Sequence, residues 1–272
     1  MLISASARLE GSELFAKNGY DAIDASFCAV ILEDERHNPI LDGDDWKEKV
    51  KREKEKCDKL GIKVQSIHMP YKYQFTEEKF PWKYEMMCRS LIAAEILGAE
   101  WAVMHMKPVE DMVPMLKKMY AETQVKNVGI AFEKSGNKRA EDLVILHDAV
   151  EAAGIPVGYC LDVGHFHINK YYEYDVVEWI YKLGSRIKVL HMHDNFRTGD
   201  NHTIPFNGNM PWEKIMRALK DVGYEGNFNY EIAFYGTPEA LKPVSVRYWK
   251  EIAEYLIKIF DEHVPNKEEM QI

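Results

Sequence analysis

Short apolar runs alternate with amphipathic stretches along the whole chain. The apolar runs have the length and composition of strands in a buried parallel sheet. They predict strands at Leu2–Ser6, Ala22–Ser26, Lys63–His68, Trp101–His105, Val128–Glu133, Val157–Asp162, Lys188–His191 and Asn227–Glu231. The spacing between them predicts helices, most clearly at Trp46–Leu60, Trp82–Leu97, Ala140–Ala153, Tyr174–Leu183 and Trp212–Val222.

A glycine directly follows each of these five helical stretches. The five are Gly61, Gly98, Gly154, Gly184 and Gly223. Glycine adopts the left-handed backbone conformation that ends many helices, so its recurrence at these places predicts five helix ends.

Eight strands alternating with about eight helices indicate a parallel sheet with right-handed crossovers. Eight such units in 272 residues favour a closed barrel over an open doubly wound sheet. No GxGxxG motif follows the first strand, which weakens a dinucleotide-binding alternative. We therefore expect an α/β fold, a single (β/α)8 TIM barrel over residues 1–272, with a polar tail that frays after about Val264.

Composition and charge limit the classes of molecule that this protein is expected to bind. Apolar residues make up 46% of the chain, enough for a large core, and the net charge is −9. Nucleic acid and anionic lipid attract basic proteins, so we expect no nucleic-acid partner and no membrane association. The four cysteines form no CxxC pair, and no apolar run approaches the ~18 residues of a membrane span. These features predict a cytoplasmic protein.

Polar side chains end most of the predicted strands, where the active site of a TIM barrel lies. Six strands end in a metal-binding type of residue: His68, His105, Glu133, Asp162, His191 and Glu231. The loops that follow add His165, Asp200 and His202. Eight of the ten histidines lie at strand ends or in these loops. A metal site explains this bias, whereas structural roles give no reason for it.

Carboxylates combined with imidazoles suit Mn²⁺, Co²⁺, Mg²⁺ or Zn²⁺, and no thiolate belongs to the set. Four of the residues come from four strands that are neighbours in the predicted barrel: Glu133, Asp162, His191 and Glu231. They are the best candidates to hold one divalent ion. His193 alternates with His191, so if His191 points inward His193 is expected to point the other way. We therefore take His191 as the ligand and His193 as a residue that supports the ligands from behind.

The loops supply further candidates for binding. Arg197 offers a fork of donors for an anion or a hydroxyl group. His165 lies one short turn after Asp162 and is expected to bind a substrate oxygen or a second metal ion. The pair Asp200 and His202 either ligates a metal ion or ties its loop down.

The order of these motifs resembles the xylose isomerase-like TIM-barrel superfamily, specifically its sugar phosphate isomerase/epimerase group, which shares a fold with endonuclease IV. The resemblance runs from GYDAIDAS to NFNYEI, nearly the whole chain. In ketose 3-epimerases of this group one divalent ion, often manganese, is held by Glu, Asp, His and Glu, and the four candidates above match those places. Relatives are commonly homodimers or homotetramers.

The resemblance also implies roles for single residues. Glu133 and Glu231 would form the acid/base pair, and His165 and Arg197 match substrate-binding positions of the family. We assign His68 and His105 to the substrate as well.

We therefore expect a metal-dependent isomerase or epimerase that acts on a ketose, a ketose phosphate or a related polyol. The reaction removes a proton next to a carbonyl group, and the metal ion stabilises the negative charge of the resulting enediolate. In an epimerase one carboxylate takes the proton and a second returns it on the opposite face. A 1,2-isomerase or an inosose-type dehydratase would use the same residues, so this choice stays open.

Two other functions remain possible on this scaffold. Endonuclease IV holds three zinc ions with a longer ligand set, whose nine residue types all have a match here: His68, His105, Glu133, Asp162, His165, His191, Asp200, His202 and Glu231. The net charge and the lack of a basic loop interleaved with aromatic residues argue against this hydrolase. The other alternative is a sugar-binding barrel without catalytic activity.

Overall fold

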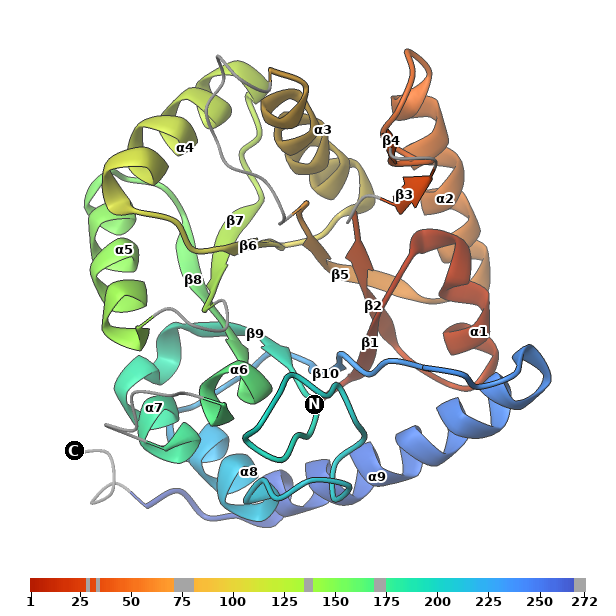
Figure 1. Cartoon of the computed structure of the whole chain (residues 1–272), viewed down its shortest axis with the longest axis vertical. Coiled ribbons are helices and arrows are strands. Elements are labelled where there is room, and N and C mark those ends of the chain that lie inside the picture. Colours follow the sequence, from red (N-terminus) through yellow and green to blue (C-terminus); the bar gives the residue numbers. More distant parts are fainter. Residues whose placement is uncertain (28–29, 33–34, 71–80, 135–138, 169–174, 267–272) are drawn as a thin grey trace.

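Eight parallel strands make the barrel, in the order β10-β1-β2-β5-β6-β7-β8-β9, and helices surround it (Figure 1). The computed structural model describes residues 1–27, 30–32, 35–70, 81–134, 139–168 and 175–266. The barrel strands are β1 (Ile3–Ala7), β2 (Ala22–Ser26), β5 (Lys63–His68), β6 (Trp101–His105), β7 (Gly129–Glu133), β8 (Val157–Asp162), β9 (Ile187–His191) and β10 (Phe228–Tyr230). The predicted (β/α)8 fold is confirmed.

The helices are α1 (Ser12–Lys17), α2 (Trp46–Leu60), α3 (Pro81–Leu97), α4 (Val109–Thr123), α5 (Ala140–Ala152), α6 (Val163–His167), α7 (Val176–Leu183), α8 (Trp212–Asp221) and α9 (Lys242–Glu262). Single 3-10 turns occur at Leu9–Gly11, Gly184–Arg186 and Glu239–Leu241. A short antiparallel hairpin of β3 (Val30–Leu32) and β4 (Glu35–His37) follows β2. None of the described helices has an apolar stretch that would cross a membrane.

The predicted elements lie where the structure has them, to within one residue at each end of the strands and two at each end of the helices. The five glycines all have a positive φ, as expected of helix ends. Gly184 differs in detail, because its ψ of −148° lies outside the left-handed helical region. There a 3-10 turn, not a left-handed cap, leads from α7 into β9.

The barrel closes between β9 and β10 through little regular pairing. Met192 forms an isolated parallel bridge with Tyr230. The backbone N–H of Met192 donates to the oxygen of Asn229 over 2.8 Å, and the N–H of Glu231 donates to the oxygen of Met192 over 3.3 Å. These bonds hold Glu231 against the end of β9.

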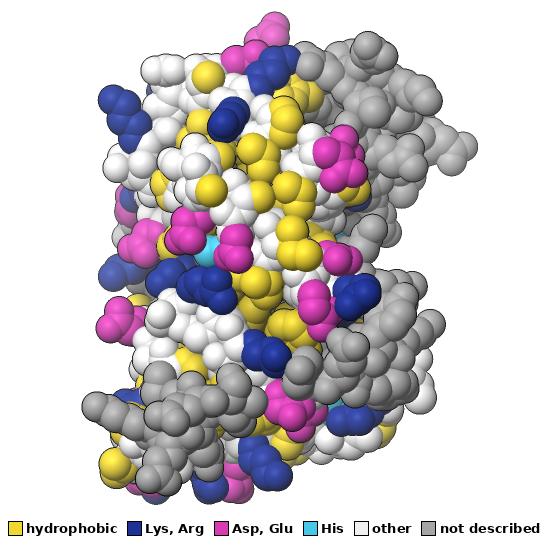
Figure 2. All heavy atoms as spheres, turned by 90° about the vertical axis from the view of Figure 1, so that its left-hand side faces the viewer, with side chains coloured by type: hydrophobic (Ala, Val, Ile, Leu, Met, Phe, Trp, Pro, Cys, Tyr) yellow, Lys and Arg dark blue, Asp and Glu magenta, His cyan; other side chains and the backbone are white. Residues whose placement is uncertain are grey.

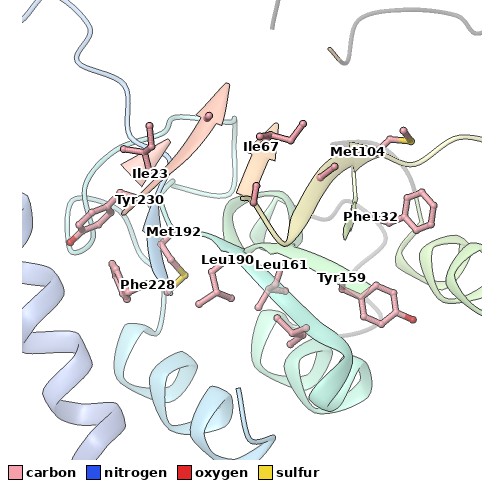
Figure 3. Close-up of a cluster of buried hydrophobic side chains, with 14 of the residues drawn as sticks. Ile23, Ile67, Met104, Phe132, Tyr159, Leu161, Leu190, Met192, Phe228 and Tyr230 are labelled. Atoms are coloured by element: carbon pink, nitrogen blue, oxygen red, sulfur yellow. The ribbon is translucent and has the colours of Figure 1, made fainter. Parts of the chain in front are cut away.

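Alternation along the strands divides the core into two parts. Phe132, Leu161 and Leu190 belong to the large core between strands and helices, part of which is shown in Figure 3. The residues on the other face of the strands form a small buried cluster inside the barrel: Val103, Ala131, Cys160 and Val189. Because side chains two residues apart share a face, this inner cluster lies one layer below Glu133, Asp162 and His191.

The long connection from β9 to α8 is organised by one buried carboxylate. Asp194 is fully buried and accepts hydrogen bonds from the backbone N–H groups of Asn195 (2.8 Å), Phe206 (3.0 Å) and Met210 (3.3 Å). It also accepts one from the indole N–H of Trp212 over 2.8 Å. The connection therefore has a fixed shape although it contains little regular structure.

We predict that Asp194→Asn lowers the free energy of unfolding by about 2–3 kcal/mol, because an amide nitrogen in place of one oxygen leaves buried donors without acceptors. Urea denaturation measures the loss. Asp58→Asn is the control, since Asp58 is an exposed partner of Lys54 and its replacement should change stability little. Equal stability of both variants would contradict the role of Asp194.

Candidate metal centre

A pocket of about 630 Å³ opens where the carboxyl ends of the barrel strands meet. Its lining residues include Arg8, Asp24, His68, His105, Glu133, His165, Asp200, His202 and Glu231. A larger hollow of about 800 Å³ lies at the opposite end of the barrel, but its described lining contains no histidine. The chemistry-bearing side chains therefore gather at the end of the barrel that TIM-barrel enzymes use.

The structure brings together the four side chains that the sequence suggested for one ion. Glu133, Asp162 and His191 end β7, β8 and β9, and Glu231 directly follows β10. One ligand atom from each of the four lies within 4.8 Å of the other three. Opposite ligands of an ion bound at ~2.1 Å would lie ~4.2 Å apart, so the spacing needs little adjustment.

Glu133 is buried among three imidazoles. Its side chain is 1% exposed, with Oε1 2.9 Å from His165 Nδ1. Its Oε2 lies 3.1 Å from His68 Nε2 and 3.2 Å from His105 Nε2. Burial by itself would raise the pKa of Glu133, but the charge and hydrogen bonds of these histidines hold that pKa well below its usual value.

Asp162 both faces the site and begins α6. Its Oδ1 accepts the backbone N–H of His165 over 2.8 Å, as an N-cap residue does. The same oxygen lies 3.0 Å from His193 Nε2. Burial would raise the pKa of Asp162, but the nearby His165 and His193 lower it.

His191 connects the site to a carboxylate that the sequence analysis did not select. Its Nδ1 lies 3.3 Å from Glu231 Oε2, and its Nε2 lies 3.4 Å from Asp24 Oδ2. Asp24 is buried on β2 and accepts hydrogen bonds from Ser6 Oγ (3.0 Å) and Ser66 Oγ (2.6 Å). The signal in the sequence is a charged residue inside the apolar strand AIDAS, two positions before the strand end.

A second carboxylate–imidazole group lies in the connection after β9. Asp200 Oδ2 lies 3.2 Å from His165 Nε2 and 3.1 Å from His202 Nε2. Nδ1 of His202 lies 2.8 Å from the backbone oxygen of Glu231. Burial would lower the pKa of His202, but the hydrogen bond with Asp200 and nearby carboxylates raise it to about 9.

His193 does not point away from the site but contacts a ligand candidate, as expected of a residue behind the ligands: its Nε2 lies 3.0 Å from Asp162 Oδ1. His193 is fully buried, and one of its nitrogens lies within 4.8 Å of ligand atoms of Asp200 and His202. Its ring stacks on that of His202 with centroids 4.1 Å apart. The strand β9 ends at His191, so its alternation does not extend to His193.

The structure does not bring Arg197 to the pocket wall. Its side chain is exposed, its φ is 66°, and its backbone N–H donates to Asn195 Oδ1 over 2.9 Å. Arg8, one residue beyond β1, lines the pocket instead. The sequence signal for Arg8 is its place directly after the first strand, at the same end of the barrel as the other strand-end residues.

Lys134 is a second residue that the sequence analysis missed. It directly follows Glu133, is fully buried, and donates from Nζ to the backbone oxygen of His165 over 2.9 Å. Burial lowers the pKa of its ammonium group to about 8. The contact fixes the short helix α6, which carries His165.

The donor set fits a divalent cation. Among the described residues, the buried atoms Asp162 Oδ2, His191 Nδ1 and Glu231 Oε2 lie 3.2–3.3 Å from an oppositely charged neighbour but make no well-aligned hydrogen bond. Buried polar atoms are normally paired, so three such atoms from neighbouring strands suit a common ion. The pKa of His191 would be lowered by its burial, but nearby groups, Cys160 first and then Glu231 and Asp24, raise it well above its usual value. The groups around His191 therefore stabilise a positive charge at this position.

We predict that Gly164→Ala disturbs this centre, because a Cβ at Gly164 would lie 1.9 Å from Cε1 of His193. Overpacking of this kind should lower the free energy of unfolding by about 1–3 kcal/mol. Gly199→Ala is the matched control, since nothing lies within 4 Å of the Cβ position there. Denaturation curves that coincide for the two variants would contradict the close packing of Gly164 and His193.

Comparison with known proteins agrees with this architecture. The family profile described as xylose isomerase-like TIM barrel matches residues 13–256. The chain is 39% identical over 57 residues to fructoselysine 3-epimerase of Escherichia coli O157:H7, a match that covers 21% of each chain. Overall, the chain spans between about a fifth and about half of the length of the curated relatives it matches.

Solved structures resemble the whole barrel. One is D-psicose 3-epimerase of Clostridium cellulolyticum H10 with D-tagatose, at 15% identity and a TM-score of 0.72, covering 94% of this chain and 99% of that one. Another is the IOLI protein with a zinc atom, at 15% identity and a TM-score of 0.69, covering 97% and 99%. These likenesses show the fold.

Proposed function

The chain belongs to the xylose isomerase-like TIM-barrel family, and from that premise we propose that it is a divalent-metal-dependent isomerase or epimerase. Its substrate is a ketose, a ketose phosphate or a related polyol. The observation that carries the proposal is the meeting of Glu133, Asp162, His191 and Glu231 at one end of the barrel. Three carboxylates and one imidazole are a donor set for Mn²⁺, Zn²⁺, Co²⁺ or Mg²⁺, with Mn²⁺ our first choice.

The four residues would hold the ion, which when bound supplies positive charge beside the oxygen atoms of the sugar. Glu231 is the group most accessible to a substrate, because its side chain is 24% exposed and lines the pocket. Glu133 is almost fully buried, and both its oxygens contact imidazoles. We assign proton transfer at carbon to these two glutamates, on the two faces of the sugar.

The remaining pocket residues would orient the substrate. His68, His105 and His165 line the pocket, and each places a ring nitrogen on Glu133. Once Glu133 holds the ion, those nitrogens would become available to hydroxyl groups of a sugar. Arg197 remains a proposed substrate-binding residue, although its side chain is exposed outside the pocket lining. Arg8 is the described arginine that lines the pocket, and we add it to the substrate-binding set.

The names of the similar proteins guide the choice of substrates. Fructoselysine 3-epimerase and D-psicose 3-epimerase are both named for inversion at carbon 3 of a ketose or ketose derivative. A first screen therefore includes psicose, tagatose, fructoselysine, their phosphates where available, and an inosose. Exchange of a carbon-bound proton for deuterium in D₂O detects proton abstraction even where the product is unknown.

We predict that the metal-loaded protein exchanges a carbon-bound proton of at least one of these substrates. Glu231→Gln should slow this exchange by about 10²–10⁴-fold, because the amide accepts no proton at neutral pH. Proton NMR in D₂O measures the rate, and circular dichroism confirms that the variant is folded.

Glu225→Gln serves as the matched control for Glu231→Gln. Glu225 is exposed near the opposite end of β10, so its loss should leave the exchange rate unchanged. Unchanged exchange in Glu231→Gln would remove this residue from the acid/base role. Absence of exchange with every substrate, together with intact sugar binding, would instead favour the non-catalytic barrel.

A second function is supported by the surroundings of the four-residue set. Glu133 Oε2 lies near both His68 and His105, and Asp200 Oδ2 lies near both His165 and His202. Two further carboxylate–imidazole groups thus border the first, as a multi-zinc phosphodiester hydrolase would require. The net charge of −9 opposes nucleic acid as the substrate, which makes this the second choice.

The number of bound ions distinguishes the two functions. We expect one ion per chain, measured by elemental analysis after reconstitution and removal of free metal. Three zinc ions per chain, with hydrolysis of bis(4-nitrophenyl) phosphate or of DNA at an abasic site, would overturn the isomerase proposal.

We predict that Asp162→Asn loses metal before it loses its fold. An ion at 100 times its dissociation constant stabilises the native protein by about 2.7 kcal/mol, and this gain should shrink in the variant. Thermal unfolding with and without Mn²⁺ or Zn²⁺ measures it. Asp111→Asn, at an exposed site in the first turn of α4, is the control and should retain the full metal-dependent shift.

A further inference from the structure

His147 is a histidine that lies far from the strand-end loops, on the helix α5. This helix is on the side of the barrel that faces the viewer in Figure 2, where acidic and basic side chains lie close together. His147 is one turn after Leu143 and one turn before Val150, so it belongs to the buried stripe of α5 and is only 1% exposed. A leucine would fill such a position without burying polar atoms.

The buried imidazole of His147 lacks the hydrogen bonds that would compensate its burial. Among the described residues, neither of its ring nitrogens has a hydrogen-bond partner. The hydroxyl group of Tyr159, whose ring centroid is 4.5 Å from that of His147, is also buried without one. Because buried polar atoms are normally paired, the unpaired imidazole suits a ligand that the chain does not itself supply.

Two carboxylates lie next to this imidazole. Asp148 is the next residue along the chain, and Glu151 follows His147 by four residues, which places both side chains on one face of the helix. One ligand atom from each of the three residues lies within 4.8 Å of the other two. Asp148 and Glu151 are exposed, so the group is open to ions from the solvent on one side and closed by His147 on the other.

The donors and their spacing suit a zinc ion. An imidazole nitrogen combined with carboxylate oxygens is a donor set for Zn²⁺, whereas Mg²⁺ and Ca²⁺ prefer oxygen ligands. Two ligands ~2.05 Å from a tetrahedral ion lie ~3.4 Å apart, and neighbouring ligands of a square-planar ion lie only ~2.9 Å apart. His147 Nδ1 lies 3.4 Å from Asp148 Oδ1, which matches the tetrahedral value. Burial, and then the charge of Arg186, lower the pKa of His147, which favours the neutral ring that binds metals.

A positive charge already occupies one side of this group. Arg186 Nη1 lies 3.3 Å from Asp148 Oδ1, and the guanidinium carbon lies 5.2 Å from the ring centroid of Tyr159. The side chain of Arg186 is 38% exposed, so it can turn toward the solvent when another cation takes its place. Arg186 would therefore compete with an ion for Asp148.

We propose that His147, Asp148 and Glu151 bind one Zn²⁺ on the outer face of the barrel, with water as the fourth ligand and with Arg186 as the competing cation. The set shares no residue with the candidate metal centre. It has three ligands, two of them exposed, so it should bind more weakly than the four residues at the strand ends. This zinc ion is therefore exchangeable and is lost when free metal is removed, which leaves the count of tightly bound ions unchanged.

Calorimetric titration with zinc chloride tests the site. The strand-end centre is first filled with zinc, free metal is removed, and further Zn²⁺ is then added. The wild-type protein should bind one ion more than His147→Leu, in which an apolar side chain takes the buried position. His263→Leu, at another histidine remote from the strand ends, is the matched control and should bind as many ions as the wild type. Circular dichroism verifies that the variants are folded.

Glu151→Gln tests the same site without changing the core. Glu151 is exposed, so this variant should fold as the wild type does. Its affinity for the added zinc should fall by about tenfold or more, because one ligand is lost. Asp142→Asn, at an exposed site in the first turn of α5, is the control and should keep the wild-type affinity.

Arg186→Gln tests the competition. Removal of this positive charge frees Asp148, so the added zinc should bind about threefold more tightly or better. Arg139→Gln is the control, since Arg139 is exposed at the start of α5 and lies near Glu141. Unchanged affinity in Arg186→Gln would exclude Arg186 as the competitor.

Equal numbers of added ions in the wild type and His147→Leu would overturn the proposal, and so would wild-type zinc affinity in Glu151→Gln. If His147→Leu does not fold, Glu151→Gln decides alone. Ions that bind at the mouth of the barrel remain in both variants, so only the difference from the wild type counts. None of these results depends on proton exchange or on the strand-end ligands, so a failure here leaves the proposed function untouched.

Discussion

A carboxylate buried at the centre of a protein is stable only when positive charge or hydrogen-bond donors compensate it. Glu133 is 1% exposed, and imidazoles of three residues lie within 3.2 Å of its oxygens. One of them, His165, also contacts the carboxylates of Asp162 and Asp200, so charges of the two signs depend on one another at the mouth of the barrel. A cation placed among Glu133, Asp162 and His191 would take over part of the role that bound protons otherwise have.

Much of this arrangement could be predicted from the sequence, because side chains alternate between the two faces of each strand. Each barrel strand is short and apolar, and its last inward residue must reach the mouth, so Glu133, Asp162 and His191 meet whatever the details of packing. This alternation gives no guide beyond the end of a strand. His193 lies beyond β9 and turns toward the site through the course of its loop, which no alternation rule describes.

Other residues were missed for physical reasons of a different kind. Asp24 lies within β2 and not at its end, and its burial depends on hydroxyl groups of Ser6 and Ser66 from neighbouring strands. Lys134 can be buried because the backbone oxygen of His165, remote in sequence, accepts a hydrogen bond from its ammonium group. Such pairings exist only once the strands are in register. Asp194 is a further example: it follows the strand that carries His191, and it accepts a hydrogen bond from the backbone N–H of Phe206 at the surface.

The inner cluster of Val103, Ala131, Cys160 and Val189 closes the barrel below the polar layer. Among the described residues these side chains fill the barrel beneath the polar layer, so we expect an ion or a substrate to reach Glu133 from the mouth. If the ion sits among the strand-end ligands and the sugar on the mouth side of it, the two would bind in a fixed order, with the ion first. Bound sugar would then block the way out, so the ion would dissociate only after the sugar.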